Sequence, residues 1–510
     1  MNDVAQRASR IRELVSQSFA LLALLAVVAR QQLIERNAVV DFDIWWHLRV
    51  GRWITENFAV PRTGLFSRTV SDRAWVAYSW GFEVLLARAE HWFGLPGVML
   101  ICVAMVMMVV FALFWMLLRL SGQFWTAILL AAIGMWAIYH NTAPRPILFS
   151  MAFFCVMLAL ILDANRTARI EPLYLLPPIF LLWSNIHIQF IYGLFLITLF
   201  LGVNVAEYIL KKSGERLPYL MEREAMLPLR RLAVVYMACI LATLIGPYSF
   251  RLYGVVLEYA HSQVAYQSIT ELQALSFRTS AHYIQLLLVA AGFFALGRSR
   301  KGVDLFKLAL LTIATVVAFR TTRDAWFVCI PCLAVIAEQC APEQREAPAP
   351  VLQRTVEFVA AIVMLVLLGR VYDVNDASLK QTMALRLPVH SAEYINANHL
   401  PGPLYNTLNF GGYLIWWMPN YPVSIDGRND LYGDEIDSRY WNSLRGFPEW
   451  RLDPDIESAN TLLLDRQFPL VDAIYNDPRF RLVHTDECGA VFVRIRGGAD
   501  ASKSPAGEKK

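Results

Sequence analysis

The sequence predicts a mainly α-helical protein that crosses a membrane many times and carries an α/β domain near its carboxyl terminus. Of its 510 residues, 56% are hydrophobic and only 17% are charged, whereas a soluble domain is about half apolar and about a quarter charged. Long apolar runs recur through the first 372 residues, and a mixed pattern follows them. The net charge of +4, without long Lys or Arg runs, argues against a nucleic-acid partner.

The apolar runs predict about eleven membrane spans, because about 20 apolar residues cross the hydrocarbon core of a bilayer. The first run lacks a small-residue cleavage site, so we expect it to be a retained anchor. The expected spans lie near residues 14–34, 95–118, 123–140, 147–163, 172–187, 190–210, 232–247, 282–297, 304–320, 325–340 and 355–372.

The positions of the basic residues predict the orientation of these spans. With eleven spans, the basic clusters all fall on one side of the membrane, and the excess of Lys and Arg assigns that side to the cytoplasm. We therefore expect a cytoplasmic amino terminus and an extracytoplasmic carboxyl-terminal domain in the cytoplasmic (inner) membrane. The clusters are Arg7/Arg10/Arg12, Arg166/Arg169, Lys211/Lys212/Arg216/Arg223/Arg230/Arg231 and Arg298/Arg300/Lys301.

The same patterns predict three parts of the chain. They are a transmembrane domain over residues 1–372 with long outer loops at 35–94 and 248–281, an extracytoplasmic α/β domain over 373–498, and a disordered tail over 499–510. Within the α/β domain we expect a helix near His390–His399 and strands near Leu404–Asn406, Tyr413–Trp417 and Val423–Ile425.

Two aspartates, Asp41 and Asp43, follow the first expected span. A carboxylate pair beside a bilayer is costly unless it faces water, a metal or a cationic partner. At a spacing of two residues, both carboxylates can turn toward one site, where they could bind a divalent cation or where one could act as a base. The alternative is that an acidic residue caps the helix that follows.

Polar residues after this pair extend the candidate site. His47 could hold a phosphate or an acceptor, or make only a structural hydrogen bond, and Arg49 and Arg52 could pair with the acids or bind phosphate. Trp45 and Trp46 are typical of membrane-interface anchors.

Three arginines lie in expected outer turns between spans. Arg145 is the only charge in the turn Asn141-Thr-Ala-Pro-Arg-Pro146, and Arg320 and Arg323 bracket another turn before Asp324. The planar guanidinium matches the geometry of phosphate oxygens, so these side chains could bind a lipid phosphate. The alternatives are snorkelling of Arg145 to lipid headgroups and an ion pair with Asp324.

Further polar residues have both functional and structural interpretations. Asn185 and His187 interrupt an apolar run, where they could line an acceptor pocket or bond one helix to another. Glu271 lies in the second long loop and could bind metal or acceptor, or simply be solvated. Asp426 and Arg428 could contact the acceptor or form a turn with side-chain hydrogen bonds.

Four of these segments resemble one known family in the same order along the chain. Asp43-Ile-Trp-Trp-His-Leu-Arg49 resembles the Asp-Pro-Tyr/Trp-Phe/Trp-His/Asn-Tyr-Arg run of oligosaccharyltransferase catalytic subunits, and Ser268-Ile-Thr-Glu271 resembles their Ser-Val-Ser-Glu element. Arg320 and Arg323 lie where those enzymes carry an arginine that contacts the donor phosphates. Asn409-Phe-Gly-Gly-Tyr-Leu-Ile-Trp-Trp417, followed by Val423-Ser-Ile-Asp-Gly-Arg428, resembles their Trp-Trp-Asp-Tyr-Gly segment. The chain therefore resembles the GT-C glycosyltransferase superfamily, and also a group of mostly uncharacterised bacterial multipass membrane proteins.

Two features depart from the oligosaccharyltransferase pattern. Met418 follows Trp417 where the Trp-Trp-Asp signature has its aspartate, and the 141–146 turn holds no second acidic motif. Recognition of a peptide sequon is therefore not implied by the resemblance.

The resemblance implies transfer of a sugar from a polyprenyl-(di)phosphate donor to a glycan, lipid or protein acceptor on the outer face of the membrane. In that reading Asp43 or Asp41 is the base or a ligand of Mg²⁺ or Mn²⁺, Glu271 assists them, and Arg49, Arg145, Arg320 and Arg323 bind the donor phosphate. His47, Asn185, His187, Asp426 and Arg428 would line the acceptor pocket. The alternatives are a transporter or flippase for a lipid-linked sugar, and a GT-C-like assembly protein without activity.

Overall fold

The computed structural model describes residues 2–214, 219–221, 225–261, 270–299, 302–342 and 351–495. The chain divides into two compact units. The helical unit comprises Met1–Ala38, Tyr78–Ala260 and Ile269–Asn375, and the C-terminal unit comprises Val39–Ala77, His261–Ser268 and Asp376–Lys510. Residues 39–77, which follow the first span, are thus grouped with the carboxyl-terminal part of the chain rather than with the helices on either side of them. The expected disordered tail, 499–510, lies outside the described residues.

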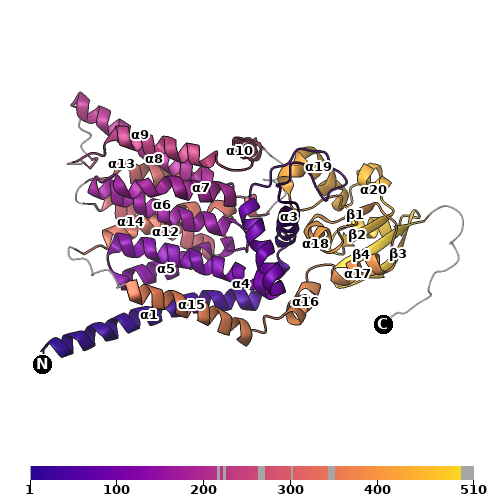
Figure 1. Cartoon of the computed structure of the whole chain (residues 1–510). Helices are drawn as coiled ribbons and strands as arrows, with labels where there is room; N and C mark the ends of the chain where they lie inside the picture. The colour runs from indigo at the N-terminus through magenta and orange to yellow at the C-terminus, as the bar shows by residue number, and fades with distance from the viewer. Residues whose placement is uncertain are drawn as a thin grey trace. The chain divides into compact units, whose positions relative to one another are not determined.

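The helical unit is a bundle in which every expected span falls on a helix (Figure 1). Within the described ranges, seven helices are long and apolar enough to cross a membrane, so the number of eleven spans stays a prediction. The mainly helical, multipass fold predicted from the sequence is confirmed. The helices are α1 (Asn2–Glu35), α4 (Trp80–Ser121), α5 (Phe124–Ile138), α6 (Ile147–Thr167), α7 (Leu176–Ile186), α8 (Phe190–Ser213), α9 (Leu229–Thr243), α10 (Arg251–His261), α12 (Ser280–Gly297), α13 (Leu305–Arg320), α14 (Trp326–Gln339) and α15 (Val351–Val371).

Helix α14 forms the centre of this bundle. Its residues from Trp326 to Val335 are all buried, and it packs against α4, α5, α6, α12 and α13. A helix that is apolar on all sides is stable only when other helices or lipid surround it. In α4 a kink at Gly94, where φ is 65°, separates an amphipathic first segment from the apolar span that begins at Leu95.

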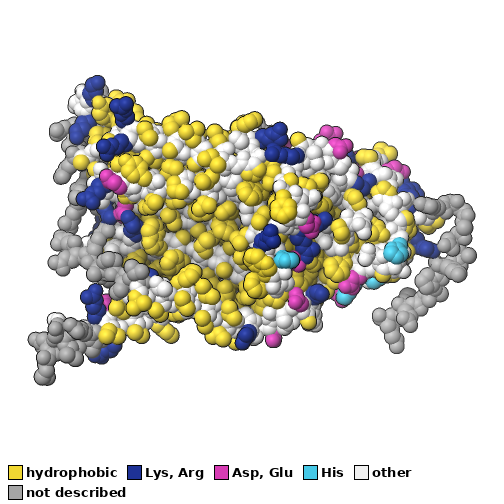
Figure 2. Space-filling model, in the orientation of Figure 1, with side chains coloured by type: hydrophobic (Ala, Val, Ile, Leu, Met, Phe, Trp, Pro, Cys, Tyr) yellow, Lys and Arg dark blue, Asp and Glu magenta, His cyan; other side chains and the backbone are white. Residues whose placement is uncertain are grey.

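The surface of the helical unit has the charge pattern of a membrane-spanning bundle. Hydrophobic side chains cover its visible face, and Lys and Arg side chains gather at the end where α1 and α9 begin (Figure 2). At that end the α6 residue Asn165 donates to Asp304, the residue before α13, at 2.8 Å. Lys307 pairs with Glu338 of α14 at 2.6 Å. These contacts link helix ends that the sequence predicted to share one side of the membrane.

The C-terminal unit contains a four-stranded mixed sheet in the order β1-β2-β4-β3. Strand β1 runs parallel to β2, with Leu404 opposite Thr461, while β2–β4 and β4–β3 are antiparallel. The strands are β1 (Leu404–Asn406), β2 (Thr461–Asp465), β3 (Phe480–Thr485) and β4 (Gly489–Arg494). The helices of this unit are α3 (Ile44–Asn57), α16 (Asp376–Ala384), α17 (Val389–Ala397), α18 (Leu408–Trp417), α19 (Asn429–Leu444), α20 (Pro454–Ser458) and α21 (Leu470–Tyr475).

Two strands predicted in this unit are wrong. Residues 413–417 belong to helix α18, and Val423 makes only an isolated bridge to Ser67. The aromatic and β-branched composition of 413–417 favours a strand, but tertiary packing prevails. A Cβ on Gly412 would lie 2.4 Å from the carbonyl oxygen of Phe42. The glycines of α18 therefore let the helix approach neighbouring backbone very closely.

Candidate functional site

Asp41 and Asp43 lie at the start of α3 and differ in their contacts. Asp41 Oδ1 accepts hydrogen bonds from the backbone N–H groups of Asp43 at 2.9 Å and Ile44 at 3.3 Å. These bonds satisfy donors that a helix start leaves unpaired. Asp43 Oδ1 instead accepts from the indole Nε1 of Trp46 at 3.2 Å. Asp41 thus serves as a cap, and both side chains remain partly exposed.

The C-terminal unit brings Asp43 beside the Asp426-Gly-Arg428 turn, although almost 400 residues of sequence separate them. A Cβ on Gly427 would lie 2.0 Å from Asp43 Oδ1 and 3.2 Å from Trp46 Nε1. Only glycine leaves room for the carboxylate and the indole at this position. Two of the sequence-predicted motifs therefore meet at one point.

Asp426 and Arg428 form an ion pair whose side chains are fully buried, with Nη2 and Oδ2 2.7 Å apart. Tyr432 also donates to Asp426 Oδ2 at 2.9 Å, and the guanidinium lies 4.8 Å from the ring centroid of Trp75. Burial lowers the pKa of Arg428, but the charge and hydrogen bonds of Asp426 together outweigh it, so the pKa is raised and Arg428 stays charged. This geometry corresponds to the turn with side-chain hydrogen bonds that the sequence left open as one interpretation.

His47 and Arg49 of α3 lie close to aromatic rings. His47 is buried, and its ring centroid lies 3.5 Å from that of Trp46. The Arg49 guanidinium lies 5.1 Å from the centroid of Phe66 and 3.6 Å from Glu56. Trp45 is also fully buried, so it packs inside the C-terminal unit rather than at a membrane interface. The sequence had no signal for the contributions of Phe66 and Trp75, because aromatic residues in a loop carry no periodic pattern. Tyr432 lies in the first turn of α19, and its contact with Asp426 was also not predicted.

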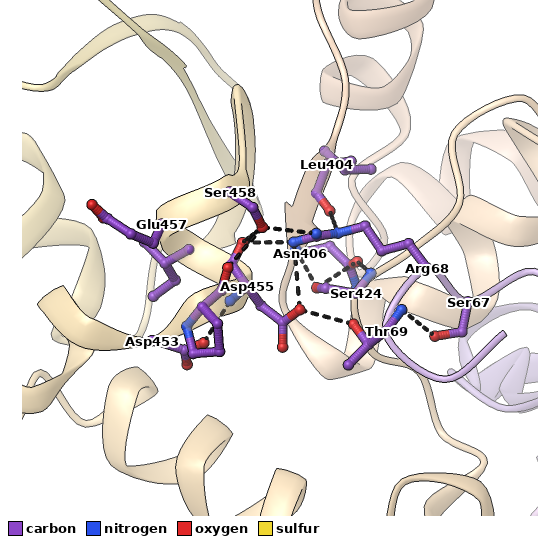
Figure 3. A network of polar contacts seen from close by, with 12 residues as sticks. Ser67, Arg68, Thr69, Leu404, Asn406, Ser424, Asp453, Asp455, Glu457 and Ser458 are labelled. Carbon is purple, nitrogen blue, oxygen red and sulfur yellow. Dashed lines mark hydrogen bonds and ion pairs between the residues drawn. The ribbon is translucent and has the colours of Figure 1, made fainter. Parts of the chain in front are cut away.

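A hydrogen-bond network joins the loop after α3 to the sheet of the same unit (Figure 3). Arg68 donates to the carbonyl oxygens of Leu404 at 3.0 Å and Asp455 at 2.6 Å. Thr69 Oγ1 donates to Asp455 Oδ1 at 3.0 Å. These bonds connect residues 67–69 to β1 and α20, and so position the segment that carries Phe66 and Trp75.

In the helical unit, hydrogen bonds join three turns that are far apart in sequence. Asn141 Nδ2 donates to the carbonyl oxygens of Thr322 at 3.1 Å and Arg323 at 2.9 Å. The N–H of Thr322 donates to the carbonyl oxygen of Gln273 at 2.9 Å. The turns at 139–146, 270–273 and 321–324 therefore lie together at one end of the bundle.

The hydrogen bonds between these turns bring Arg145, Glu271 and the Arg320–Arg323 turn to the same end of the helical bundle. Arg145 Nη1 lies 3.2 Å from Glu271 Oε1, and the two side chains are 23% and 47% exposed. An ion pair this exposed stabilises the fold by only about 0–1 kcal/mol. Arg145 can therefore release Glu271 and bind a ligand instead at little cost in free energy. Thr321 donates to Asp324 at 2.6 Å. Ser268 and Ile269, the first half of the Ser-Ile-Thr-Glu element, lie outside the described residues.

Asn185 and His187 make contacts within the helical unit that join its elements. Asn185 Nδ2 donates to the carbonyl oxygen of Ile245, and Trp80 Nε1 donates to Asn185 Oδ1. His187 is buried, and its Nδ1 lies 2.8 Å from Ser150 Oγ, which also accepts from Trp183. These bonds correspond to the helix-to-helix interpretation of both residues.

The residues described fit a divalent cation only in part. Mg²⁺ requires six oxygen ligands in near-octahedral geometry. Oδ1 of Asp41 and Oδ1 of Asp43 already accept hydrogen bonds from α3. In the ranges that the structure describes, no three His, Cys, Asp or Glu side chains form a group able to hold a metal.

Comparison with known proteins matches the fold rather than the sequence. No protein-family model matches the chain, and no curated protein matches it. Among solved structures, the archaeal oligosaccharyltransferase AglB from Archaeoglobus fulgidus, in complex with an inhibitory peptide and a dolichol-phosphate, is 9% identical with a TM-score of 0.51. That match covers 88% of this chain and 69% of AglB.

Two further structures are similar at lower scores. The apo form of the A. fulgidus oligosaccharyltransferase is 10% identical, with a TM-score of 0.49 and the same coverage of 88% and 69%. ArnT from Cupriavidus metallidurans, bound to undecaprenyl phosphate, is 13% identical with a TM-score of 0.48, over 94% of this chain and 98% of ArnT. The AglB match shows that the chain shares the fold of that structure, in agreement with the fold that the sequence resemblance implied. At these identities the likeness is one of fold.

Proposed function

We propose that this protein is a membrane glycosyltransferase that moves a sugar from a polyprenyl-(di)phosphate donor to an acceptor on the outer face of the cytoplasmic membrane. The fold shared with AglB carries the proposal. The dolichol-phosphate in that structure is bound by AglB, and we extend the same class of donor to this chain. The cluster of Arg145, Glu271 and the Arg320–Arg323 turn supports a phosphate-binding role.

The proposed reaction is an inverting displacement at the anomeric carbon. The acceptor heteroatom attacks that carbon from the side opposite the phosphate, and the bond between the carbon and the phosphate oxygen breaks. The acceptor proton passes to a carboxylate, and the lipid phosphate leaves with the bonding electrons. Arg145, Arg320 and Arg323 stabilise the charge that develops on the phosphate as it leaves.

Asp43 is the preferred base in this proposal. Asp41 Oδ1 is committed to two backbone N–H groups, whereas Asp43 accepts from a side chain, Trp46, whose indole orients the carboxylate. Arg145 contacts the Glu271 carboxylate and would exchange it for the donor phosphate. Because Arg binds phosphate through a planar fork, Lys is not expected to replace Arg145 fully.

The test uses the purified full chain in detergent with labelled polyprenyl-phosphate and polyprenyl-diphosphate sugars, and follows release of the lipid phosphate. We expect release with the parent protein and with Tyr475→Ala, whose side chain is 65% exposed in the C-terminal unit. Asp43→Asn should abolish it. Full release by both Asp43→Asn and Asp41→Asn would refute the mechanism. Transport of the lipid-linked sugar without release would favour the transporter reading, because a transporter leaves the sugar–phosphate bond intact.

A further inference from the structure

A pocket of about 280 Å³ lies within the C-terminal unit, between α16, α17 and α18. Its size is near the lower end, about 300 Å³, of pockets that bind small molecules. Aromatic side chains of α18 line one part of it, namely Tyr413, Trp416 and Trp417. Charged and polar side chains of α16 and α17 line another part, including Lys380, His390 and Glu393. None of the roles derived above uses this pocket.

The aromatic part of the pocket is held firmly in place. The ring centroids of Trp416 and Trp417 lie 5.8 Å apart, and those of Tyr413 and Trp416 lie 6.0 Å apart. Behind them, Trp45 lies 4.6 Å from Trp416. Trp417 is 39% exposed, so its ring is available to a ligand while its neighbours are packed. A rigid aromatic surface binds without a large loss of side-chain entropy.

The polar part offers both donors and acceptors. Lys380 can only donate hydrogen bonds, whereas the carboxylate of Glu393 can only accept them. His390 Nδ1 lies 3.3 Å from Glu393 Oε2, and the two side chains are 56% and 52% exposed. Because the pair is solvated, it is weak, and its groups can turn toward a ligand. A compound with many hydroxyl groups, each both donor and acceptor, satisfies this set.

We propose that this pocket binds a pyranose ring of a glycan. One face of the ring, which carries C–H groups, stacks on the electron-rich face of the neutral Trp417 indole. The ring hydroxyls then reach Lys380, His390 and Glu393. Assigning this glycan to the acceptor rests on the function proposed above, whereas binding of the ring itself does not.

Saturation-transfer NMR on the full chain in detergent tests the proposal. The probes are the methyl pyranosides of glucose, galactose and N-acetylglucosamine, with the open-chain polyol mannitol as the negative control. We expect saturation of the ring protons of at least one pyranoside and none for mannitol. Trp417→Ala should weaken that binding at least about tenfold because the stacking surface is lost. Tyr475→Ala, an exposed aromatic outside the pocket, should leave it unchanged.

Other outcomes separate this proposal from the function proposed above. Asp43→Asn should keep pyranoside binding even where transfer is lost, because Asp43 does not line the pocket. Binding that persists unchanged in both Trp417→Ala and Glu393→Gln would overturn the proposal. So would the absence of saturation with all three pyranosides, whether or not the protein releases lipid phosphate.

Discussion

At the scale of single residues, Asp41 and Asp43 lie two positions apart but make different contacts. One caps α3 through backbone N–H groups, and the other accepts from the Trp46 indole beside Gly427. The sequence predicted a carboxylate pair with two interpretations, catalytic and capping. The structure assigns the capping contacts to Asp41, which leaves Asp43 as the stronger candidate for chemistry.

Two substitutions of Asp41 distinguish its role as a helix cap from a role in the chemical reaction. Asn caps a helix about as well as Asp, whereas Ala costs about 1 kcal/mol. We expect Asp41→Ala to lower the melting temperature and Asp41→Asn to leave it nearly unchanged, as followed by tryptophan fluorescence of the full chain. Loss of transfer in Asp41→Asn without loss of stability would assign a chemical role to Asp41 as well.

The buried pair of Asp426 and Arg428 should contribute mainly to stability. Arg428→Met leaves a buried carboxylate without its partner, which costs about 3–5 kcal/mol. The double variant Asp426→Leu/Arg428→Met removes both charges and should be more stable than the single one. Denaturant midpoints of the full chain measure this difference. If Arg428→Met lowered the free energy of unfolding by less than about 1 kcal/mol, the structural role would be contradicted. Contact of the pair with the acceptor would then be the better interpretation.

The raised pKa of Asp437 predicts that the stability of the folded protein depends on pH. Burial, followed by the charge of Asp434, raises the pKa of Asp437 to about 7, while Arg73 lowers it. Between the pKa of Asp437 in the unfolded chain and about 7, the folded state keeps a proton on Asp437 that the unfolded state has lost. Protonation of Asp437 therefore stabilises the folded state at low pH, and this stabilisation is lost as pH rises through about 7. The melting temperature of Asp437→Asn should therefore fall less than that of the parent between about pH 5 and about pH 8. Glu435→Gln, at an exposed position of the same helix, should keep the parent slope.

At the scale of elements, α18 illustrates why the strand prediction for 413–417 was wrong. The segment has strand-forming residues, but Gly411 and Gly412 allow the helix to contact the carbonyl oxygens of Ile425 and Phe42 at distances that no Cβ permits. Such close approach is a property of the folded unit and leaves no local sequence pattern. In contrast, β1 at Leu404–Asn406 and α17 near 390–399 are confirmed, because their local composition agrees with their packing.

Gly412→Ala tests this packing. Alanine normally stabilises a helix by about 1 kcal/mol relative to glycine, but here its Cβ would lie 2.4 Å from the carbonyl oxygen of Phe42. We expect a net loss of about 1–3 kcal/mol from overpacking, measured by thermal unfolding of the full chain. The matched control is Gly202→Ala in α8, where nothing lies within 4 Å of the new Cβ, and which should be neutral or stabilising. Equal melting temperatures for the two variants would contradict the close contact.

At the scale of the whole molecule, the orientation in the membrane remains a prediction from the basic residues. Single cysteines introduced into a cysteine-free full chain can test it with a membrane-impermeant maleimide on intact cells. Lys212→Cys, in the last turn of α8, should react only after permeabilisation. Asn476→Cys, directly after α21, should react without it, because the positive-inside rule puts the C-terminal unit outside. The reverse pattern would invert the proposed topology.

The sequence by itself determined the class of the molecule. Hydrophobic runs of sufficient length must span a bilayer or form a buried core, so the helices could be located from local composition alone. The order of short motifs was also sufficient to indicate the GT-C fold, later matched by AglB. These features depend on residues that are close together in the chain.

Only the tertiary structure decided which distant residues meet. It joined Asp43 to the turn at Gly427, Arg145 to Glu271, and Asn141 to the backbone of Arg323. It also made Asp426 and Arg428 a buried pair and gathered the side chains of three helices around the aromatic pocket. Contacts across hundreds of residues depend on how helices and turns pack, and that packing is a collective result of the whole unit rather than of any local pattern.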